Sequence, residues 1–196
     1  MSVADRLSAP LVTPSAPPPA RRADAARNRE RLLAAARAAF AESGPDASMA
    51  EVARRAGVGM ATLYRNFPGR RELLEALYVD EVDAICAVAG EVPGDTPGER
   101  LRAWLVRFGG FIAAKHEVAD ELLAQSGRDD PVFDGSRDRV IAAGRPLLAA
   151  AQAAGEVREG LELEQVLDLV IAVGAIRGDG AYVTPILRVA LDGLRP

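Results

Sequence analysis

Arg65 and Asn66 are adjacent, and they carry side chains well suited to reading base pairs. An arginine guanidinium pairs with the edge of guanine in the major groove of DNA, and an asparagine amide pairs with the edge of adenine. Such contacts require an element that enters the groove with these side chains facing the bases. The elements around this pair therefore decide whether the contact is possible.

Two short helices separated by a glycine turn are predicted here. Ser48 and Glu51 form a capping box, in which the serine accepts from a free N–H and the glutamate reaches back to the Ser48 N–H. This helix ends at Gly57, and a second covers about 59–67. In a helix-turn-helix, the second helix places its N-terminal residues in the major groove. The segment 48–67 is therefore predicted to be a helix-turn-helix that binds DNA.

The rest of the chain has the periodicity of amphipathic helices and no convincing strand. Alanine and leucine dominate, and β-branched residues are scattered among the 196 residues. Further helices are predicted over about 24–43, 70–89, 97–115, 118–125, 131–154, 164–177 and 184–193. Pro146 could break the helix that contains it. The predicted fold class is all-α, with about nine helices in total.

Composition divides the chain into three predicted parts. Residues 1–23 are rich in proline and are expected to form a disordered arm. Residues 24–69 form a three-helix domain that contains the helix-turn-helix. Residues 70–196 form a larger helical domain.

The charge is distributed unevenly along the chain. Net charge is −4, yet residues 20–71 carry about +6 and the remainder about −10. The basic block is either a surface that contacts phosphates or a solvated face. Its first arginines, Arg21 and Arg22, could enter a minor groove from the arm, or remain idle in a disordered segment.

The sequence offers little for catalysis, metal binding or membrane insertion. Cys86 and His116 are the single cysteine and the single histidine, so no zinc site, cofactor or nucleophilic pair is expected. No phosphate-binding glycine loop or nucleophile elbow occurs. No apolar run is long enough for a signal peptide or a membrane span, which favours a cytoplasmic protein. Two alternatives to a DNA-binding regulator stay open: an enzyme, and a helical interaction module that does not bind DNA.

One stretch is more specific than a generic pair of helices. Residues 49–74 read MAEVARRAGVGMATLYRNFPGRRELL, and RLLAAA lies upstream of them. Nearly position for position, this stretch resembles the DNA-binding domain of the TetR family of bacterial regulators, with the match extending over about 28–77. The C-terminal pattern is similar to the SbtR-like branch of that family. Gly59 stands where serine is common in the family, and Asn66 where histidine is more frequent.

The resemblance implies phosphate contacts near the starts of three helices. Ser48, Thr62 and Arg70 would make them, and free N–H groups at the helix start would assist Arg70. Tyr64 would reach a phosphate or a base through its hydroxyl. Two structural alternatives stay open: Thr62 as only a local helix cap, and Tyr64 packed on the helix over 24–43.

The resemblance also implies that Arg65 and Asn66 read bases or contact the DNA backbone. Met60 and Ala61 precede them and offer no hydrogen bonds, so they are limited to apolar contacts, for example with thymine methyl groups. The sequence therefore predicts a recognition helix whose first turn is poorly polar.

The family's second domain implies a small-molecule effector and a homodimer. The predicted helix over 164–177 is apolar around much of its circumference, as expected for burial on more than one side. The helix over 184–193 carries a narrower apolar stripe. We expect these two helices to pair with those of a second subunit, so that two recognition helices read the halves of a palindromic operator. Repression is favoured over activation because a compact dimer bound at a promoter blocks polymerase, and the sequence does not decide between the two.

Tyr78, Trp104, Phe108 and Phe111 are the large side chains of this domain. The last three lie at i, i+4 and i+7 on one helix face. Such a stripe is typical of a core, while the family resemblance implies a ligand pocket, and both interpretations stay open. A ligand there would favour another tilt of the helix over 70–89 and thereby lower the affinity for the operator.

Overall fold

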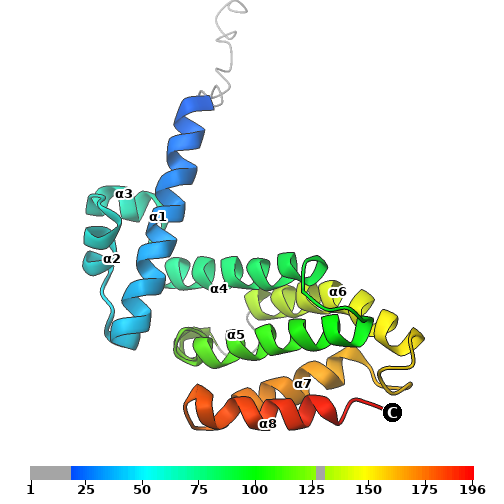
Figure 1. Ribbon diagram of the computed structural model, residues 1–196. Coiled ribbons are helices and arrows are strands. Elements are labelled where there is room, and N and C mark those ends of the chain that lie inside the picture. The colour runs from blue at the N-terminus through cyan, green and yellow to red at the C-terminus, as the bar shows by residue number, and fades with distance from the viewer. Residues whose placement is uncertain (1–18, 127–130) are drawn as a thin grey trace, which may run out of the picture.

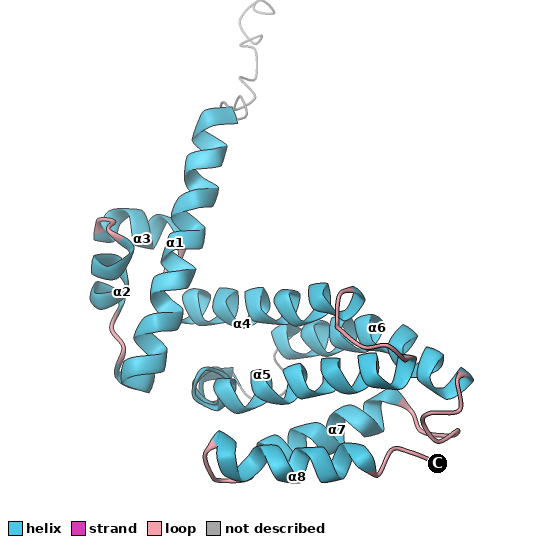
Figure 2. Ribbon diagram, in the orientation of Figure 1, coloured by secondary structure: helices cyan, strands magenta, loops and turns pink. Residues whose placement is uncertain are grey.

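The computed structural model describes residues 19–126 and 131–196, in which eight α-helices and two short 3₁₀ turns are joined by loops (Figures 1 and 2). No strand occurs in these two ranges, which confirms the prediction of an all-α fold. The α-helices are α1 (Pro19–Ser43), α2 (Met49–Ala56), α3 (Met60–Asn66), α4 (Arg70–Ala87), α5 (Pro97–Ser126), α6 (Pro131–Ala153), α7 (Leu163–Gly174) and α8 (Gly180–Asp192). The 3₁₀ turns are η1 (Gly44–Asp46) and η2 (Val88–Gly90).

Two apolar cores hold these helices together, and α4 belongs to both. The first core joins α1, α2 and α3 to the first half of α4, where Leu73, Leu74 and Leu77 are fully buried. The second core joins the remainder of α4 to α5, α6, α7 and α8, and it includes Val82 and Ile85. In Figure 1, α4 runs from the α1–α3 unit into the C-terminal helices. A continuous helix therefore connects the two parts.

Helix α1 starts earlier than the sequence pattern predicted. It begins at Pro19 rather than at Asp24, so residues 19–23 are helical instead of belonging to the arm. The remainder of the predicted arm, residues 1–18, lies outside the described residues, as do the side chains of Arg21 and Arg22. In Figure 1 the N-terminal turns of α1 extend past α2 and α3.

The predicted count of about nine helices becomes eight among the described residues because two predicted helices are one. Helix α5 is continuous from Pro97 to Ser126, where a break after Lys115 was expected. No glycine or proline occurs between Lys115 and Val118, so nothing in that stretch ends a helix. Helix α6 likewise continues through Pro146.

Close packing explains why α6 contains a glycine beside that proline. The side chain of Trp104 is fully buried, and a β-carbon on Gly144 would lie 2.3 Å from its ring. The indole N–H of Trp104 donates to the carbonyl of Ile85 at 3.1 Å. This one side chain therefore joins α4, α5 and α6.

Caps outside the predicted pattern fix the starts of two C-terminal helices. Helix α8 begins at Gly180, earlier than the predicted start at Thr184, because the Asp179 carboxylate accepts from the Tyr182 N–H at 2.9 Å. At the start of α5, the Glu156 carboxylate accepts from the Gly98 N–H at 2.7 Å. Within residues 19–126 and 131–196, no helix combines the length and the apolar character of a membrane-spanning segment.

Candidate nucleic-acid interface and ligand cavity

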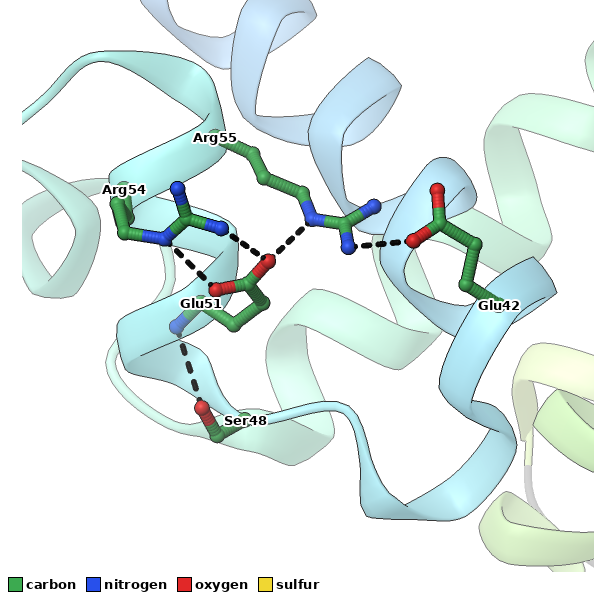
Figure 3. A network of polar contacts seen from close by, with 5 residues as sticks. All are labelled: Glu42, Ser48, Glu51, Arg54 and Arg55. Atoms are coloured by element: carbon green, nitrogen blue, oxygen red, sulfur yellow. Dashed lines mark hydrogen bonds and ion pairs between the residues drawn. The ribbon is translucent and has the colours of Figure 1, made fainter.

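Helix α2 begins at the serine that the sequence pattern predicted as its cap. The Ser48 hydroxyl oxygen accepts from the Glu51 N–H at 3.1 Å, and the Ser48 backbone is extended. The Glu51 carboxylate does not complete the predicted capping box. It is turned instead toward Arg54 and Arg55 (Figure 3), because two guanidinium groups compete for it with a single backbone N–H.

This carboxylate lies at the centre of a polar network that fixes α2 against α1. Glu51 accepts from Arg54 at 2.7 Å and 2.9 Å, and also from Arg55. Arg55 reaches in addition across to Glu42 of α1, at 2.6 Å (Figure 3). Hydrogen bonds from Arg54 and Arg55 lower the pKa of Glu51 to about 2, and the hydrogen bond from Arg55 lowers the pKa of Glu42. The two arginines thus bond to acids within this domain.

The turn between α2 and α3 has the geometry of a helix-turn-helix. Gly57 adopts a left-handed backbone with φ +66°, and its N–H bonds back to the last turn of α2. Gly59 precedes α3 with extended backbone and without a side-chain cap, as its lack of a side chain requires. Leu63 and Phe67 are buried against the first core. These contacts leave one face of α3 in solvent.

That exposed face carries most of the residues expected to meet DNA. Tyr64 is 47% exposed and Met60 is 38% exposed, so the tyrosine ring is not packed into the core. Ala61 and Arg65 are also exposed. The Arg65 guanidinium donates to the Thr62 hydroxyl at 2.9 Å, which holds the arginine along the helix surface.

Two of the expected contact residues are engaged elsewhere. The Asn66 amide donates to the carbonyl of Thr62 at 2.8 Å, within its own helix. The Arg70 guanidinium lies over the Phe40 ring, 4.9 Å from its centroid, and donates to the carbonyl of Ala47. Arg70 therefore ties the start of α4 to α1 and to the segment before α2. The sequence pattern did not predict this bracing role, because it depends on contacts between distant segments.

A second polar link connects α1 to the middle of α4. The Arg37 guanidinium pairs with Asp80 and, at 3.5 Å, with Glu81. These acids lie on the same helix as Tyr78 and Val82, which face a cavity in the C-terminal helices. The link therefore joins the helix-turn-helix unit to the part of α4 that lines this cavity.

The cavity has a volume of about 210 Å³ and lies between α4, α5, α6 and α7. Its lining comprises Tyr78, Val82, Phe108, Phe111, Ile112, Phe133, Asp134, Ser136, Arg137, Val140, Leu167 and Ile171. Three of the four predicted pocket residues are therefore present. Trp104 is not among them, because its ring is fully buried in the core.

Residues of α6 complete the cavity, and they were missing from the prediction. Phe133, Ser136, Arg137 and Val140 share one face of α6 at helical spacing. This periodicity indicates a buried face, but it does not distinguish a cavity wall from a core. No group of three or more His, Cys, Asp or Glu side chains that could hold a metal ion occurs within the described residues. The side chain of His116 is outside that description.

The last two helices of the chain present apolar side chains to solvent. Leu169 of α7 is 38% exposed, and Tyr182 and Val189 of α8 are 61% and 72% exposed. Tyr182 and Val189 lie seven residues apart and thus on one face of α8. Figure 1 shows α7 and α8 side by side at the edge of the C-terminal helices.

Comparison with known proteins agrees with both halves of this architecture. The profile described as bacterial regulatory proteins, tetR family, matches residues 32–77, and the profile of the transcriptional regulator SbtR-like C-terminal domain matches residues 96–196. A TetR transcriptional regulator from Streptomyces coelicolor is 36% identical, with a TM-score of 0.71 over 86% of this chain and 98% of that one. A TetR transcription regulatory protein from Mycobacterium vanbaalenii is 35% identical, with a TM-score of 0.71 over 90% and 99% of the two chains.

Proposed function

Since the chain belongs to the TetR family of bacterial transcriptional regulators, we propose that it is a ligand-responsive repressor that binds a palindromic operator as a homodimer. The observation that carries this proposal is the solvent-facing surface of α3, on which Tyr64 and Arg65 are exposed beside a helix-turn-helix turn. A tyrosine and an arginine exposed next to each other at this position suit the polar contacts that a recognition helix makes with DNA. The same exposure weighs against an interaction module in which this surface has no ligand.

In this proposal, α3 enters the major groove with Arg65 and Tyr64 as its main polar contacts. Met60 and Ala61 give apolar contacts at the start of the helix. Ser48 is exposed, and its hydroxyl oxygen already accepts a hydrogen bond, which leaves the hydroxyl proton for a phosphate oxygen. The residues of α3 would thus read bases, while Ser48 would position the protein on the DNA backbone.

The remaining predicted contact residues have supporting roles in this proposal. Thr62 accepts from Arg65 and so sets the direction of that guanidinium. Asn66 reads a base only by giving up its bond to the Thr62 carbonyl. Arg70 acts as the brace that orients the helix-turn-helix on α4. We therefore expect substitution of Arg70 to disturb the geometry of the domain. This effect should be larger than that of losing a single phosphate contact.

The homodimer is proposed to form through α7 and α8. The exposed side chains of Leu169, Tyr182 and Val189 provide an apolar surface that a second copy would cover. Dimerisation places two copies of α3 on one face of the DNA, where they read half-sites one helical turn, about 34–36 Å, or a multiple of that, apart. A two-fold symmetric protein therefore selects a palindromic site.

Ligand response is proposed to act through α4. A ligand in the cavity touches Tyr78 and Val82, while Asp80 and Glu81 on the same helix pair with Arg37 of α1. A ligand that prefers another position of α4 would therefore also move the helix-turn-helix. The affinity for the operator then falls by a factor set by how much more tightly the ligand binds that second state.

The test first selects a DNA site for the full chain from a pool of random duplexes. Binding of the full chain to that site is then measured by fluorescence anisotropy. Arg65→Gln is expected to weaken binding to the selected site by about 1–3 kcal/mol, or about 5- to 150-fold, and to relax selectivity at one base position. The matched control is Arg100→Gln, which removes the same charge from an exposed position on α5 and should change binding less than twofold. Failure to select any site, or equal effects of both variants, would overturn the proposal.

A further inference from the structure

Four aromatic rings from three helices meet at the cavity between α4, α5, α6 and α7. The ring centroids of Tyr78 and Phe133 are 5.3 Å apart, those of Tyr78 and Phe111 6.2 Å, and those of Phe108 and Phe111 6.1 Å. All four residues line the cavity, so they form a continuous aromatic wall. The face of an aromatic ring carries negative potential and attracts cations within about 6 Å of its centroid.

The charged side chains around this wall differ in whether they have an ion-pair partner. Arg137 pairs with Asp168 of α7 at 3.2 Å. Arg139, the residue that precedes Val140 of the cavity wall on α6, pairs with Asp83 of α4. Asp134 lines the cavity, and among the described residues it has neither an ion-pair nor a hydrogen-bond partner. Both arginines therefore have an acidic partner, whereas the Asp134 carboxylate, which is exposed to solvent at the cavity, has none among the described residues.

The position of Asp134 in its helix does not provide a full counter-charge for its carboxylate. It lies in the first turn of α6, where a carboxylate interacts favourably with the helix dipole. The helix N-terminus supplies only a fraction of a positive charge, and the Asp134 carboxylate accepts no hydrogen bond within the described residues. The carboxylate is therefore available to a ligand in the cavity.

The size of the cavity limits the ligand further. Its volume of about 210 Å³ is below the roughly 300–1,000 Å³ of sites for drug-sized molecules. The Tyr78 and Phe133 rings meet edge to face, at 74°, so a flat ring system can stack on one of them and contact the other at its edge. We propose that the effector is a planar aromatic cation of one or two rings, with its charge beside Asp134 and its rings against Tyr78 and Phe133. This inference rests on the proposed ligand response and names the chemical class of the effector.

The test compares three bicyclic probes of similar shape that differ in charge: N-methylquinolinium, 2-methylnaphthalene and 2-naphthoate. Their dissociation constants for the full-length protein are measured by calorimetry or competition fluorescence. N-methylquinolinium is expected to bind at least tenfold more tightly than either of the others. Asp134→Asn should remove most of this preference and leave the affinity for 2-methylnaphthalene within twofold, since the two side chains have nearly the same shape.

The matched control is Asp138→Asn, which removes a negative charge from an exposed position one turn further along α6 that does not line the cavity. It should leave the preference for the cation within twofold of the unmodified protein. Tightest binding of 2-naphthoate, equal effects of the two variants, or no cation binding up to millimolar concentration would each overturn the inference. Cation binding with the expected preference but unchanged operator affinity would show that the cavity selects aromatic cations, and it would contradict both their role as effector and the proposed ligand response.

Discussion

The polar link between α1 and α4 gives the most informative perturbation of this protein. Arg37→Gln removes the pairs with Asp80 and Glu81, whose side chains are 45% and 14% exposed, while that of Arg37 itself is 41% exposed. Pairs exposed to this degree contribute about 0.2–1 kcal/mol each. The variant should therefore stay folded, with its melting temperature lowered by only about 2–4 °C for each kcal/mol lost.

The effect on coupling should exceed the effect on stability. With the link removed, a shift of α4 is transmitted less directly to the helix-turn-helix. Substitutions along such a connection change coupling by about 0.5–2 kcal/mol, which is a factor of about 2–30 in the ratio of operator affinities. We therefore expect Arg37→Gln to bring the ratio of operator affinities without and with effector closer to one.

The assay is anisotropy of the selected operator, titrated with and without saturating N-methylquinolinium or any other compound that releases the operator. Arg27→Gln is the control, because Arg27 is also on α1 but, within the described residues, pairs only with Asp24 one turn earlier. For each variant, the operator affinity without effector is divided by the operator affinity with effector. Any change in basal DNA binding cancels in this ratio, so the two variants can be compared. If Arg37→Gln is folded and its ratio matches that of Arg27→Gln, the proposed route through α4 is wrong.

Further predictions concern acid stability, packing and assembly. Because the pKa of Glu51 is about 2 in the folded protein against an ordinary 4.5, its ion pairs should stabilise the fold above pH 4.5 and lose that contribution as the pH falls toward 2; Glu51→Gln should flatten this dependence in thermal unfolding followed by circular dichroism. Gly144→Ala places a β-carbon 2.3 Å from the Trp104 ring and should cost about 1–3 kcal/mol in urea unfolding, whereas Gly110→Ala, which meets no atom within 4 Å, should gain about 0.5–1 kcal/mol; a similar change in both would contradict the packing argument. Val189→Glu should yield monomers in sedimentation velocity, and a persistent dimer would exclude this face of α8 from the interface.

Local signals in the sequence were sufficient to predict the helix-turn-helix. Ser48 as a cap and Gly57 as a left-handed turn residue act through neighbours within four positions, so their effect follows from the sequence alone. The break predicted after Lys115 was wrong because a short polar stretch without glycine or proline does not end a helix. The early start of α8 depends on Asp179, a cap that lies outside the periodic apolar pattern.

Contacts between distant segments could not be predicted in the same way. Arg70 had the residue type and position of a phosphate ligand, but its partners Phe40 and Ala47 become neighbours only in the folded chain. Trp104 belonged to a stripe that was both a core and a cavity candidate. The packing of its ring against Gly144 decided for the core, while Phe108 and Phe111 on the same stripe line the cavity.

The central claim is that two copies of this chain read a symmetric DNA site through α3. Its most direct measurement is selection of a binding site from random duplex DNA, followed by footprinting and determination of the number of chains per duplex. We expect an inverted repeat, protection of two major-groove segments one helical turn or a multiple of it apart, and an even number of chains per duplex. Enrichment of no sequence, or protection of a single asymmetric segment by one chain, would contradict it.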